Sequence, residues 1–322
     1  MKPKVYIAKP IPESVEKYIA EYCEYKIWDE KTPIPKEKLL EEIKDIDGLM
    51  LPKGEITNEF LDQAPKLKVV SNIAVGYDGF DIEAMKKHKV LGTHTPHVLD
   101  ETVADTIFGL ILMTARKLSE CNHHVKKGHW NKMDSEDFFG KDVHDATLGI
   151  IGMGRIGEKV ARRATQGFNM NVLYYNRSRR KDVEEKYNVR YSDMTNLLRE
   201  SDFVLLMLPL TNSTFQFMGA NEFKLMKTDA FFFNCSRGKT VDENALIEAL
   251  KMKKISGAGL DVYEQEPINK DNPLLLMDNV VTLPHIGSAT KKTRDDMAMR
   301  AAENLVAGVT GKTPPDVVKE MR

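Results

Sequence analysis

The sequence has few of the features that mark secreted, membrane-spanning or metal-binding proteins. Its 322 residues include only three cysteines, Cys23, Cys121 and Cys235, which share no close spacing. We therefore predict neither a disulfide framework nor a zinc site, and we expect a reducing, cytoplasmic location. No apolar run is long enough to cross a membrane, and the first residues lack the apolar stretch of a signal peptide.

The sequence also lacks an excess of either charge. Its formal net charge is −1, so we predict no nucleic-acid binding, and the basic run at 177–181 is a local feature. The histidines are scattered, and the adjacent His123 and His124 would point to different faces of a helix, so we predict no metal site. Hydrophobic residues make up 42% of the chain, which is typical of a globular protein with a sizeable core. The length leaves room for two domains.

Short apolar segments alternate with helical patterns along residues 4–95. The segments predicted as strands are Val5–Ala8, Gly48–Leu51, Val69–Ile73 and Val90–Gly92. The helical patterns between them include Lys36–Ile43 and Asn58–Ala64. Short apolar strands separated by helices favour a parallel sheet with helices on both faces.

The same alternation recurs between about Val98 and Ala289, after a long helical pattern that begins DETVADTIFGLILMTARKL. The strands predicted there are Thr147–Ile151, Val172–Tyr175, Phe203–Leu206, Ala230–Asn234, Gly257–Leu260 and Val280–Thr282. The helices predicted there and in the tail include Ile156–Gln166, Glu243–Met252 and Thr293–Val306. Turn residues around Pro96 and Pro284 mark two hinges. We therefore expect a discontinuous domain of residues 1–97 and 291–322, a second domain of residues 98–290, and a cleft between them.

The stretch GMGRIG places three glycines between an apolar strand and a helix. Gly152 permits a tight turn, Gly154 lets the backbone approach a pyrophosphate, and Gly157 lets the helix pack closely on the strand. The N–H groups at the start of the helix attract a phosphate. In this strand–turn–helix context the motif predicts dinucleotide binding. The alternative is a glycine-rich turn that binds another ligand, such as S-adenosylmethionine.

Four further stretches carry a family resemblance: NIAVGYDGFD (72–81), NCSRGKTVDENALIEAL (234–250), GAGLDVYEQEP (257–267) and TLPHIGSAT (282–290). Together with GMGRIG they resemble the D-isomer-specific 2-hydroxyacid dehydrogenases, over nearly the whole chain and in the same order. Segments such as HIGSAT look most like the glyoxylate/hydroxypyruvate reductases that also reduce 2-ketogluconate. The resemblance implies an α/β fold of two doubly wound parallel-sheet domains, with a Rossmann cofactor domain inserted in a flavodoxin-like substrate domain.

Three residues have the chemistry that reduction of a 2-keto acid needs. Arg237 follows a predicted strand, where ligands bind, and its planar fork suits a carboxylate, although a solvated surface arginine is the alternative. His285 also follows a strand and can donate a proton near neutral pH, although a lone histidine is often structural. A hydrogen bond from His285 to Glu266 would favour the protonated imidazole. Arg237, Glu266 and His285 match the catalytic trio of the family.

The resemblance also implies contacts with substrate and cofactor. The backbone amides of Val75 and Gly76 would bind the substrate carboxylate, and Leu51 would contact the far end of the substrate. Asp261 would hydrogen-bond the nicotinamide carboxamide, whereas Cys235 has no dedicated base and is interpreted as a packing residue. The full set of cofactor contacts expected is Val103, Gly152, Gly154, Arg155, Ile156, Gly157, Asn176, Arg177, Ser178, Arg179, Leu208, Pro209, Cys235, Ser236, Asp261, His285, Gly287 and Ser288.

The end of the second strand of the cofactor domain has an unusual sequence. Such strands often end in a carboxylate that binds the adenosine ribose, but this one ends in Asn176 and is followed by Arg177, Ser178 and Arg179. An asparagine does not repel a 2′-phosphate, and arginines near this position accommodate it. We therefore predict NADPH as the cofactor, with weaker use of NADH. The alternative is that the basic run is only the solvated start of a helix.

The leading hypothesis is an NADPH-dependent reductase of glyoxylate, hydroxypyruvate and 2-ketogluconate. One alternative is a non-catalytic dinucleotide sensor or corepressor on the same fold, and another is a short NAD-dependent phosphoglycerate or D-lactate-type dehydrogenase. A homodimer is also expected. The segment Lys117–His144 is long for a connection and contains Trp130, Phe138 and Phe139, and family members use the matching arm to embrace a partner.

Overall fold

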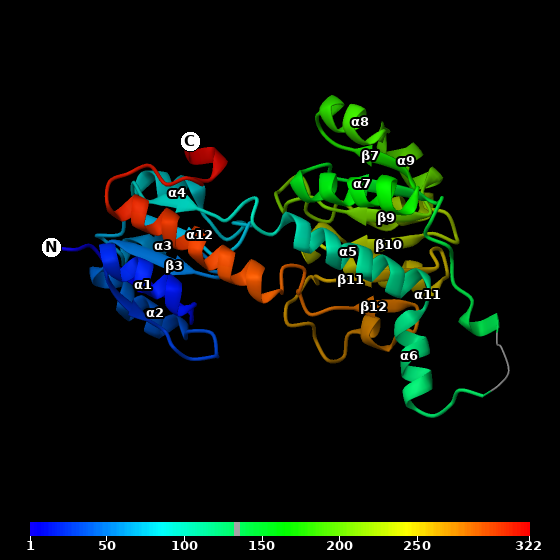
Figure 1. The fold of residues 1–322 in the computed structure, drawn as a ribbon, viewed down its shortest axis with the longest axis horizontal. Coiled ribbons are helices and arrows are strands. Elements are labelled where there is room, and N and C mark those ends of the chain that lie inside the picture. Colours follow the sequence, from blue (N-terminus) through cyan, green and yellow to red (C-terminus); the bar gives the residue numbers. More distant parts are fainter. Residues whose placement is uncertain (132–135) are drawn as a thin grey trace. The chain divides into compact units, whose positions relative to one another are not determined.

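The computed structural model describes residues 1–131 and 136–322, which form two compact units (Figure 1). The first unit consists of residues 1–99 and 289–322, and the second of residues 100–288. All the strand pairs in both units are parallel. The chain is therefore an α/β protein with two parallel sheets, as the sequence predicts.

The first unit has a five-stranded sheet in the order β2-β1-β3-β4-β5. Its strands are β1 Lys4–Ile7, β2 Glu24–Ile27, β3 Gly48–Leu51, β4 Val69–Asn72 and β5 Leu91–Thr93. Its helices are α1 Glu13–Tyr22, α2 Lys36–Glu42, α3 Asn58–Asp62, α4 Ile82–Lys87 and α12 Lys291–Val309, with 3-10 turns η1 Ile43–Asp45 and η5 Lys319–Met321. This strand order is the flavodoxin-like one, and it reverses between β1 and β3.

The second unit has a seven-stranded sheet in the order β12-β11-β10-β9-β6-β7-β8. Its strands are β6 Thr147–Ile151, β7 Asn171–Tyr175, β8 Arg190–Tyr191, β9 Phe203–Leu206, β10 Phe231–Asn234, β11 Gly257–Leu260 and β12 Val280–Thr282. Its helices are α5 Asp100–Ala115, α6 Leu118–Lys126, α7 Arg155–Phe168, α8 Lys181–Tyr187, α9 Met194–Glu200, α10 Ala220–Leu225 and α11 Glu243–Lys251, with 3-10 turns η2 Glu136–Phe138, η3 Gly238–Thr240 and η4 Pro273–Leu276. The order reverses between β6 and β9, which is where a doubly wound sheet binds a dinucleotide.

Helices cover both faces of the second sheet. Successive residues of a strand point to opposite sides, and here the side chains on both sides are apolar. On one face, Phe232 and Val204 join an apolar cluster with Leu197 of α9, Phe223 of α10 and Leu246 of α11. On the other face, α5 and α7 pack side by side, as Figure 1 shows. The central strands β6 and β9 are short and almost wholly buried, so they appear in the sequence as uninterrupted apolar runs.

The structure differs from the sequence prediction at three elements. Strand β2 was not predicted, because its sequence EYKI is partly charged and lies at the sheet edge. Strand β8 was also not predicted, and it has only two residues, both exposed. The long helical pattern from Asp100 is not one helix, because Lys117 takes a left-handed backbone with φ of 51° and separates α5 from α6.

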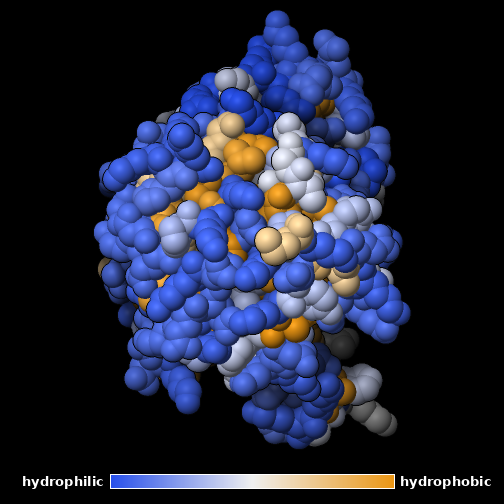
Figure 2. All heavy atoms as spheres, turned by 90° about the vertical axis from the view of Figure 1, so that its left-hand side faces the viewer, coloured by the Kyte–Doolittle hydropathy of each residue, from blue (hydrophilic) through white to orange (hydrophobic). Residues whose placement is uncertain are grey.

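Helix α12 returns to the first unit and closes its core. The Ser71 hydroxyl donates to the carbonyl of Ala301 at 2.7 Å, and Gly308 packs against Val69. The surface of this unit seen in Figure 2 is mostly hydrophilic, with apolar areas among polar side chains. None of the described helices is both long and apolar enough to span a bilayer.

Candidate active site

The glycine loop after β6 has the shape that its sequence predicts. Gly152 has a φ of +107°, and a Cβ there would lie 2.6 Å from the carbonyl oxygen of Met207. A Cβ on Gly157 would lie equally close, 2.6 Å, to the carbonyl oxygen of Gly152. By contrast, a Cβ on Gly154 would meet nothing within 4 Å. Open space beside Gly154, directly before α7, fits the diphosphate of a dinucleotide.

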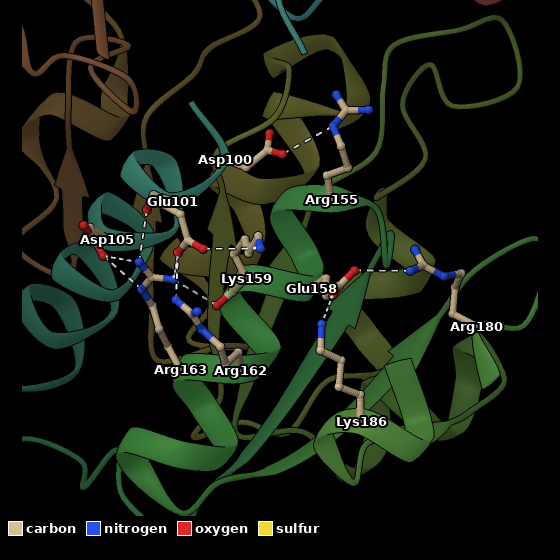
Figure 3. A network of polar contacts seen from close by, with 10 residues as sticks. All are labelled: Asp100, Glu101, Asp105, Arg155, Glu158, Lys159, Arg162, Arg163, Arg180 and Lys186. Atoms are coloured by element: carbon tan, nitrogen blue, oxygen red, sulfur yellow. Dashed lines mark hydrogen bonds and ion pairs between the residues drawn. The ribbon is translucent and has the colours of Figure 1, made fainter. Parts of the chain in front are cut away.

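Arg155 and Ile156 begin helix α7 directly after this loop. The Nε of Arg155 lies 3.3 Å from the carboxylate of Asp100, which is only 4% exposed. Next to Asp100, Glu101 pairs with Lys159, Arg162 and Arg163 of α7 (Figure 3). These ion pairs tie the start of α5 to the helix that carries the glycine loop.

The basic run after β7 is a folded loop. Asn176 donates from its side-chain amide to the carbonyl of Ser178 at 3.0 Å. Arg179 forms a forked contact with Glu184, whose carboxylate it approaches to 2.7 Å. This pairing, together with a hydrogen bond from Tyr174, lowers the pKa of Glu184 to about 2. Arg177 has no side-chain partner among the residues that the structure describes, so its guanidinium is available to a ligand.

Arg180 was not among the site residues expected from the sequence, yet it joins this loop to the glycine loop. Its guanidinium donates to the carbonyl of Met153 and to Glu158, both at 3.2 Å, and it also pairs with Asp182. Figure 3 shows Glu158 between Arg180 and Lys186. Only its position in a run of basic residues hinted at this role, because the sequence does not reveal which arginine turns inward.

Arg237 follows β10 in a tight, internally bonded turn. The buried side chain of Asn234 holds both ends of the turn, since its oxygen accepts from the N–H of Ser236 at 3.0 Å and its nitrogen donates to the carbonyl of Arg237 at 3.0 Å. At the next residue, a Cβ on Gly238 would lie 1.8 Å from the backbone of Tyr263. Glycine is therefore required where this turn meets the loop after β11. Asn234 was missed by the sequence analysis, although a polar residue ending an apolar strand was a signal.

His285 and Glu266 form a hydrogen-bonded pair. Nδ1 of His285 lies 2.8 Å from one oxygen of Glu266, and the other oxygen accepts from the N–H of Tyr263 at 3.3 Å. The His285 side chain is 48% exposed, whereas that of Glu266 is 23% exposed. His285 also has a φ of +53°, a conformation that costs energy outside glycine and clusters at functional sites. Arg237, Glu266 and His285 thus follow the neighbouring strands β10, β11 and β12.

Asp261 fixes the backbone that follows His285. Its two carboxylate oxygens accept from the N–H groups of Ile286 and Gly287, each at 2.8 Å. Burial raises the pKa of the Asp261 carboxyl, while these two hydrogen bonds and nearby His285 act in the opposite direction. From α5, the hydroxyl of Thr106 donates to the carbonyl of Gly287 at 3.1 Å. The predicted contact of Asp261 with a nicotinamide stays a prediction, but the residue has a clear structural part in the site.

The other expected cofactor residues of the second unit lie around the carboxyl edge of its sheet. Leu208 and Pro209 follow β9, and Leu208 lies 3.1 Å from where a Cβ of Gly152 would be. The side chain of Val103 lies close to Gly287, and Ser288 directly follows Gly287 in the chain. Cys235 and the buried Ser236 belong to the Arg237 turn. Burial raises the pKa of the Cys235 thiol, which agrees with a packing role and not with a nucleophile.

The expected substrate residues of the first unit follow β3 and β4. Val75 and Gly76 lie in the loop after β4, and their carbonyls accept from His94 and Asn72. Leu51 ends β3, and its side chain is buried in the core of the unit, only 1% exposed. Contact of Leu51 with a substrate therefore stays a prediction.

Comparison with known proteins identifies the family. Residues 108–287 match the model of the D-isomer specific 2-hydroxyacid dehydrogenase, NAD binding domain. The chain belongs to the D-isomer-specific 2-hydroxyacid dehydrogenases.

Several known proteins resemble the chain over nearly its whole length. Glyoxylate/hydroxypyruvate reductase B of Escherichia coli K12 is 46% identical over 318 residues, which is 99% of this chain and 98% of that protein. The crystal structure of the TT0316 protein of Thermus thermophilus has a TM-score of 0.91 and 36% identity, covering 98% of this chain and 99% of that one. The NADPH-dependent glyoxylate/hydroxypyruvate reductase of Sinorhizobium meliloti, solved with NADP and malonate, has a TM-score of 0.86 and 30% identity. The match covers 99% of this chain and 98% of that one. This dehydrogenase thus has the fold of reductases of small 2-keto acids.

Proposed function

We propose that this dehydrogenase uses NADPH to reduce glyoxylate and hydroxypyruvate, and also 2-ketogluconate, to D-2-hydroxy acids. The observation that carries the proposal is the 2.8 Å contact between His285 and Glu266. These two residues and Arg237 follow β12, β11 and β10, which are consecutive strands of the second sheet. A non-catalytic sensor of dinucleotides would have no use for such a proton-donating pair. The curated Escherichia coli relative and the Sinorhizobium meliloti structure bear names that agree with this substrate class.

The nicotinamide cofactor supplies the hydride that is added to C2 of the keto acid. Arg237 holds the substrate carboxylate and the keto oxygen with its planar guanidinium. His285 donates a proton to the keto oxygen as it becomes a hydroxyl, and Glu266 stabilises the imidazolium before that transfer. One hydride and one proton together reduce the carbonyl. Asp261 keeps His285 in place by holding the two N–H groups that follow it.

The two units divide the work in this proposal. The second unit binds the cofactor through the glycine loop and the loop after β7. It corresponds to the domain of residues 98–290 that the sequence predicts. The first unit binds the substrate carboxylate through the amides of Val75 and Gly76. Both sets of groups follow the carboxyl ends of parallel strands, where ligands bind in this class of sheet.

The NADPH preference rests on the loop after β7. Asn176 does not repel a 2′-phosphate, Arg177 has a free guanidinium among the described side chains, and Ser178 offers a hydroxyl. Arg179 is already engaged by Glu184, so Arg177 carries the larger share of the preference. NADH, which lacks the phosphate, is the weaker cofactor.

A cytoplasmic homodimer completes the proposal. Trp130 is 75% exposed and Phe139 is 66% exposed, and both lie in the segment Lys117–His144, of which residues 132–135 lie outside the described residues. Phe138 packs on the ring of His124, with ring centroids 4.8 Å apart. Large exposed aromatic side chains are enriched at interfaces between subunits.

The His285→Ala variant tests the proposed chemistry. Its kcat for glyoxylate reduction should fall roughly 10²- to 10⁴-fold, because the general acid is lost. Its NADPH dissociation constant, measured by cofactor fluorescence, should change little. A variant that retains wild-type kcat would remove His285 from the mechanism.

A further inference from the structure

Three consecutive carbonyl groups in the loop after β4 are each held by a different donor. The carbonyl of Ala74 accepts from the N–H of Thr95 at 2.9 Å. The carbonyl of Val75 accepts from Nδ1 of His94 at 2.8 Å, and that of Gly76 accepts from the side-chain amide of Asn72 at 2.6 Å. The donors come from the ends of the neighbouring strands β4 and β5, and both side-chain donors are buried.

Holding the carbonyls also sets the direction of the amides. In a trans peptide the C=O and the following N–H point in opposite directions. The N–H groups of Val75, Gly76 and Tyr77 therefore point away from Thr95, His94 and Asn72. Among the residues that the structure describes, none of these three N–H groups has an acceptor. Successive unpaired N–H groups that point the same way are suited to bind an anion.

We infer that Asn72 and His94 are positioning residues that aim the amides of Val75, Gly76 and Tyr77 at the carboxylate of the substrate. This inference rests on the proposed function, which assigns the carboxylate to this loop. It adds Tyr77 N–H as a third donor and gives the two buried side chains a part in substrate binding. Neither side chain touches the substrate, because each lies on the carbonyl side of the peptide units.

His94 is itself held firmly by the C-terminal part of the chain. The side-chain amide of Asn304 donates to the His94 carbonyl at 3.0 Å, and the His94 N–H donates to the carbonyl of Asp316 at 3.2 Å. The edge of the His94 ring meets the ring of Tyr77, with centroids 5.1 Å apart and planes at 80°. Because a carbonyl can only accept, Nδ1 of His94 must carry a proton. Helix α12 and the tail thus support the loop without forming part of it.

Two pairs of variants separate hydrogen bonding from packing. His94→Phe keeps an aromatic ring against Tyr77 but has no donor, whereas His94→Asn loses the ring and retains an amide donor near the position of Nδ1. Asn72→Asp keeps the shape but places an acceptor against the Gly76 carbonyl. We expect His94→Phe and Asn72→Asp to raise the KM for glyoxylate about tenfold, and His94→Asn to stay near the wild type. Because the carboxylate is bound equally in the ground and transition states, kcat should change little.

Thr93→Val provides the matched control. The Thr93 hydroxyl is fully buried next to His94 in the chain and bonds Ser71 at 3.1 Å, but it holds no carbonyl of the loop. This variant should lower the melting temperature and leave the KM for glyoxylate unchanged. The KM for NADPH, set by the second unit, should be unchanged in all the variants.

Calorimetric binding of oxamate, a non-reactive analogue of a 2-keto acid, to the NADPH complex gives a readout that needs no turnover. Weaker oxamate binding by His94→Phe, restored by His94→Asn, supports the inference. Equal binding by all the variants, or a loss of NADPH binding that matches the loss of oxamate binding, overturns it. A wild type that binds oxamate but reduces no 2-keto acid would refute the proposed function and leave the inference about the loop standing.

Discussion

Glu266 contacts His285 and the backbone of Tyr263 with different oxygens of one carboxylate, at 2.8 Å and 3.3 Å. The loop after β11 therefore holds the carboxylate that pairs with the histidine. The same loop lies so close to Gly238, the residue after Arg237, that a Cβ there would clash with the backbone of Tyr263.

The variant Glu266→Gln should slow the reduction of glyoxylate. Glutamine keeps the shape of the side chain but carries no charge, so the imidazolium of His285 loses its anionic partner. The kcat should then fall, though by less than in His285→Ala, and the dissociation constant for NADPH should change little. A kcat equal to that of the wild type would show that the pair has no part in proton donation.

The two arginines of the loop after β7 should differ in their importance for the cofactor. Arg179 is engaged by Glu184, whereas Arg177 has no side-chain partner in the described part of the chain. Arg177→Ala should therefore raise the KM for NADPH about tenfold or more, with a smaller effect of Arg179→Ala. Neither change should affect the KM for NADH much. Equal effects on both cofactors would argue against recognition of the 2′-phosphate by this loop.

A single methyl group at position 238 should disturb the site. A Cβ there would lie 1.8 Å from the backbone of Tyr263, so Gly238→Ala must displace the loop that holds Glu266. We expect a loss of about 1–3 kcal/mol in the free energy of unfolding, together with reduced kcat. Gly109→Ala is the control, because a Cβ at this exposed helical position meets nothing within 4 Å. That variant should be neutral or slightly more stable, since alanine favours helix.

The ion pair between Arg179 and Glu184 should make the stability of the fold depend on pH in the acidic range. The pKa of Glu184 is lowered from 4.5 to about 2, so its contribution is present above about pH 4.5 and is lost as the pH falls toward 2. Glu184→Gln should remove this contribution. Melting curves between neutral pH and pH 3 should therefore differ most between wild type and variant near neutrality and converge in acid. Parallel curves would show that the pair does not stabilise the fold.

The oligomeric state can be tested through the exposed aromatic residues. Sedimentation of the 36.6 kDa chain at micromolar concentration should give a dimer. Trp130→Ser together with Phe139→Ser should weaken that dimer, because both side chains are largely exposed in the single chain. A wild-type monomer would contradict the proposal.

The sequence predicts the fold well where burial dictates the pattern. Strands β3, β6, β9, β11 and β12 have the predicted bounds, because each is a short apolar run between helices. The exposed edge strands β2 and β8 have no such pattern, and neither glycine nor proline marks the break at Lys117. In these places the tertiary structure, and not the local sequence, determines where a strand forms or a helix ends.

For the candidate site, the sequence indicates the residue types but not their partners. The His285–Glu266 contact is expected from the resemblance to the family's catalytic trio, and the structure contains it. The supports supplied by Asn234, Arg180 and His94 are not, because each depends on which side chain turns toward a backbone carbonyl in the folded chain. Which arginine is already neutralised by Glu184 is equally hidden until the loop is folded.

The most direct test of the central claim is kcat/KM for a panel of 2-keto acids, measured with NADPH and with NADH in parallel. Glyoxylate and hydroxypyruvate should be reduced with NADPH in clear preference to NADH, and hydroxypyruvate should exceed pyruvate, because a site that bonds a hydroxyl discriminates against its absence. Higher values for pyruvate or 2-ketoisocaproate than for both of these acids, or higher values with NADH than with NADPH, would contradict the proposed function.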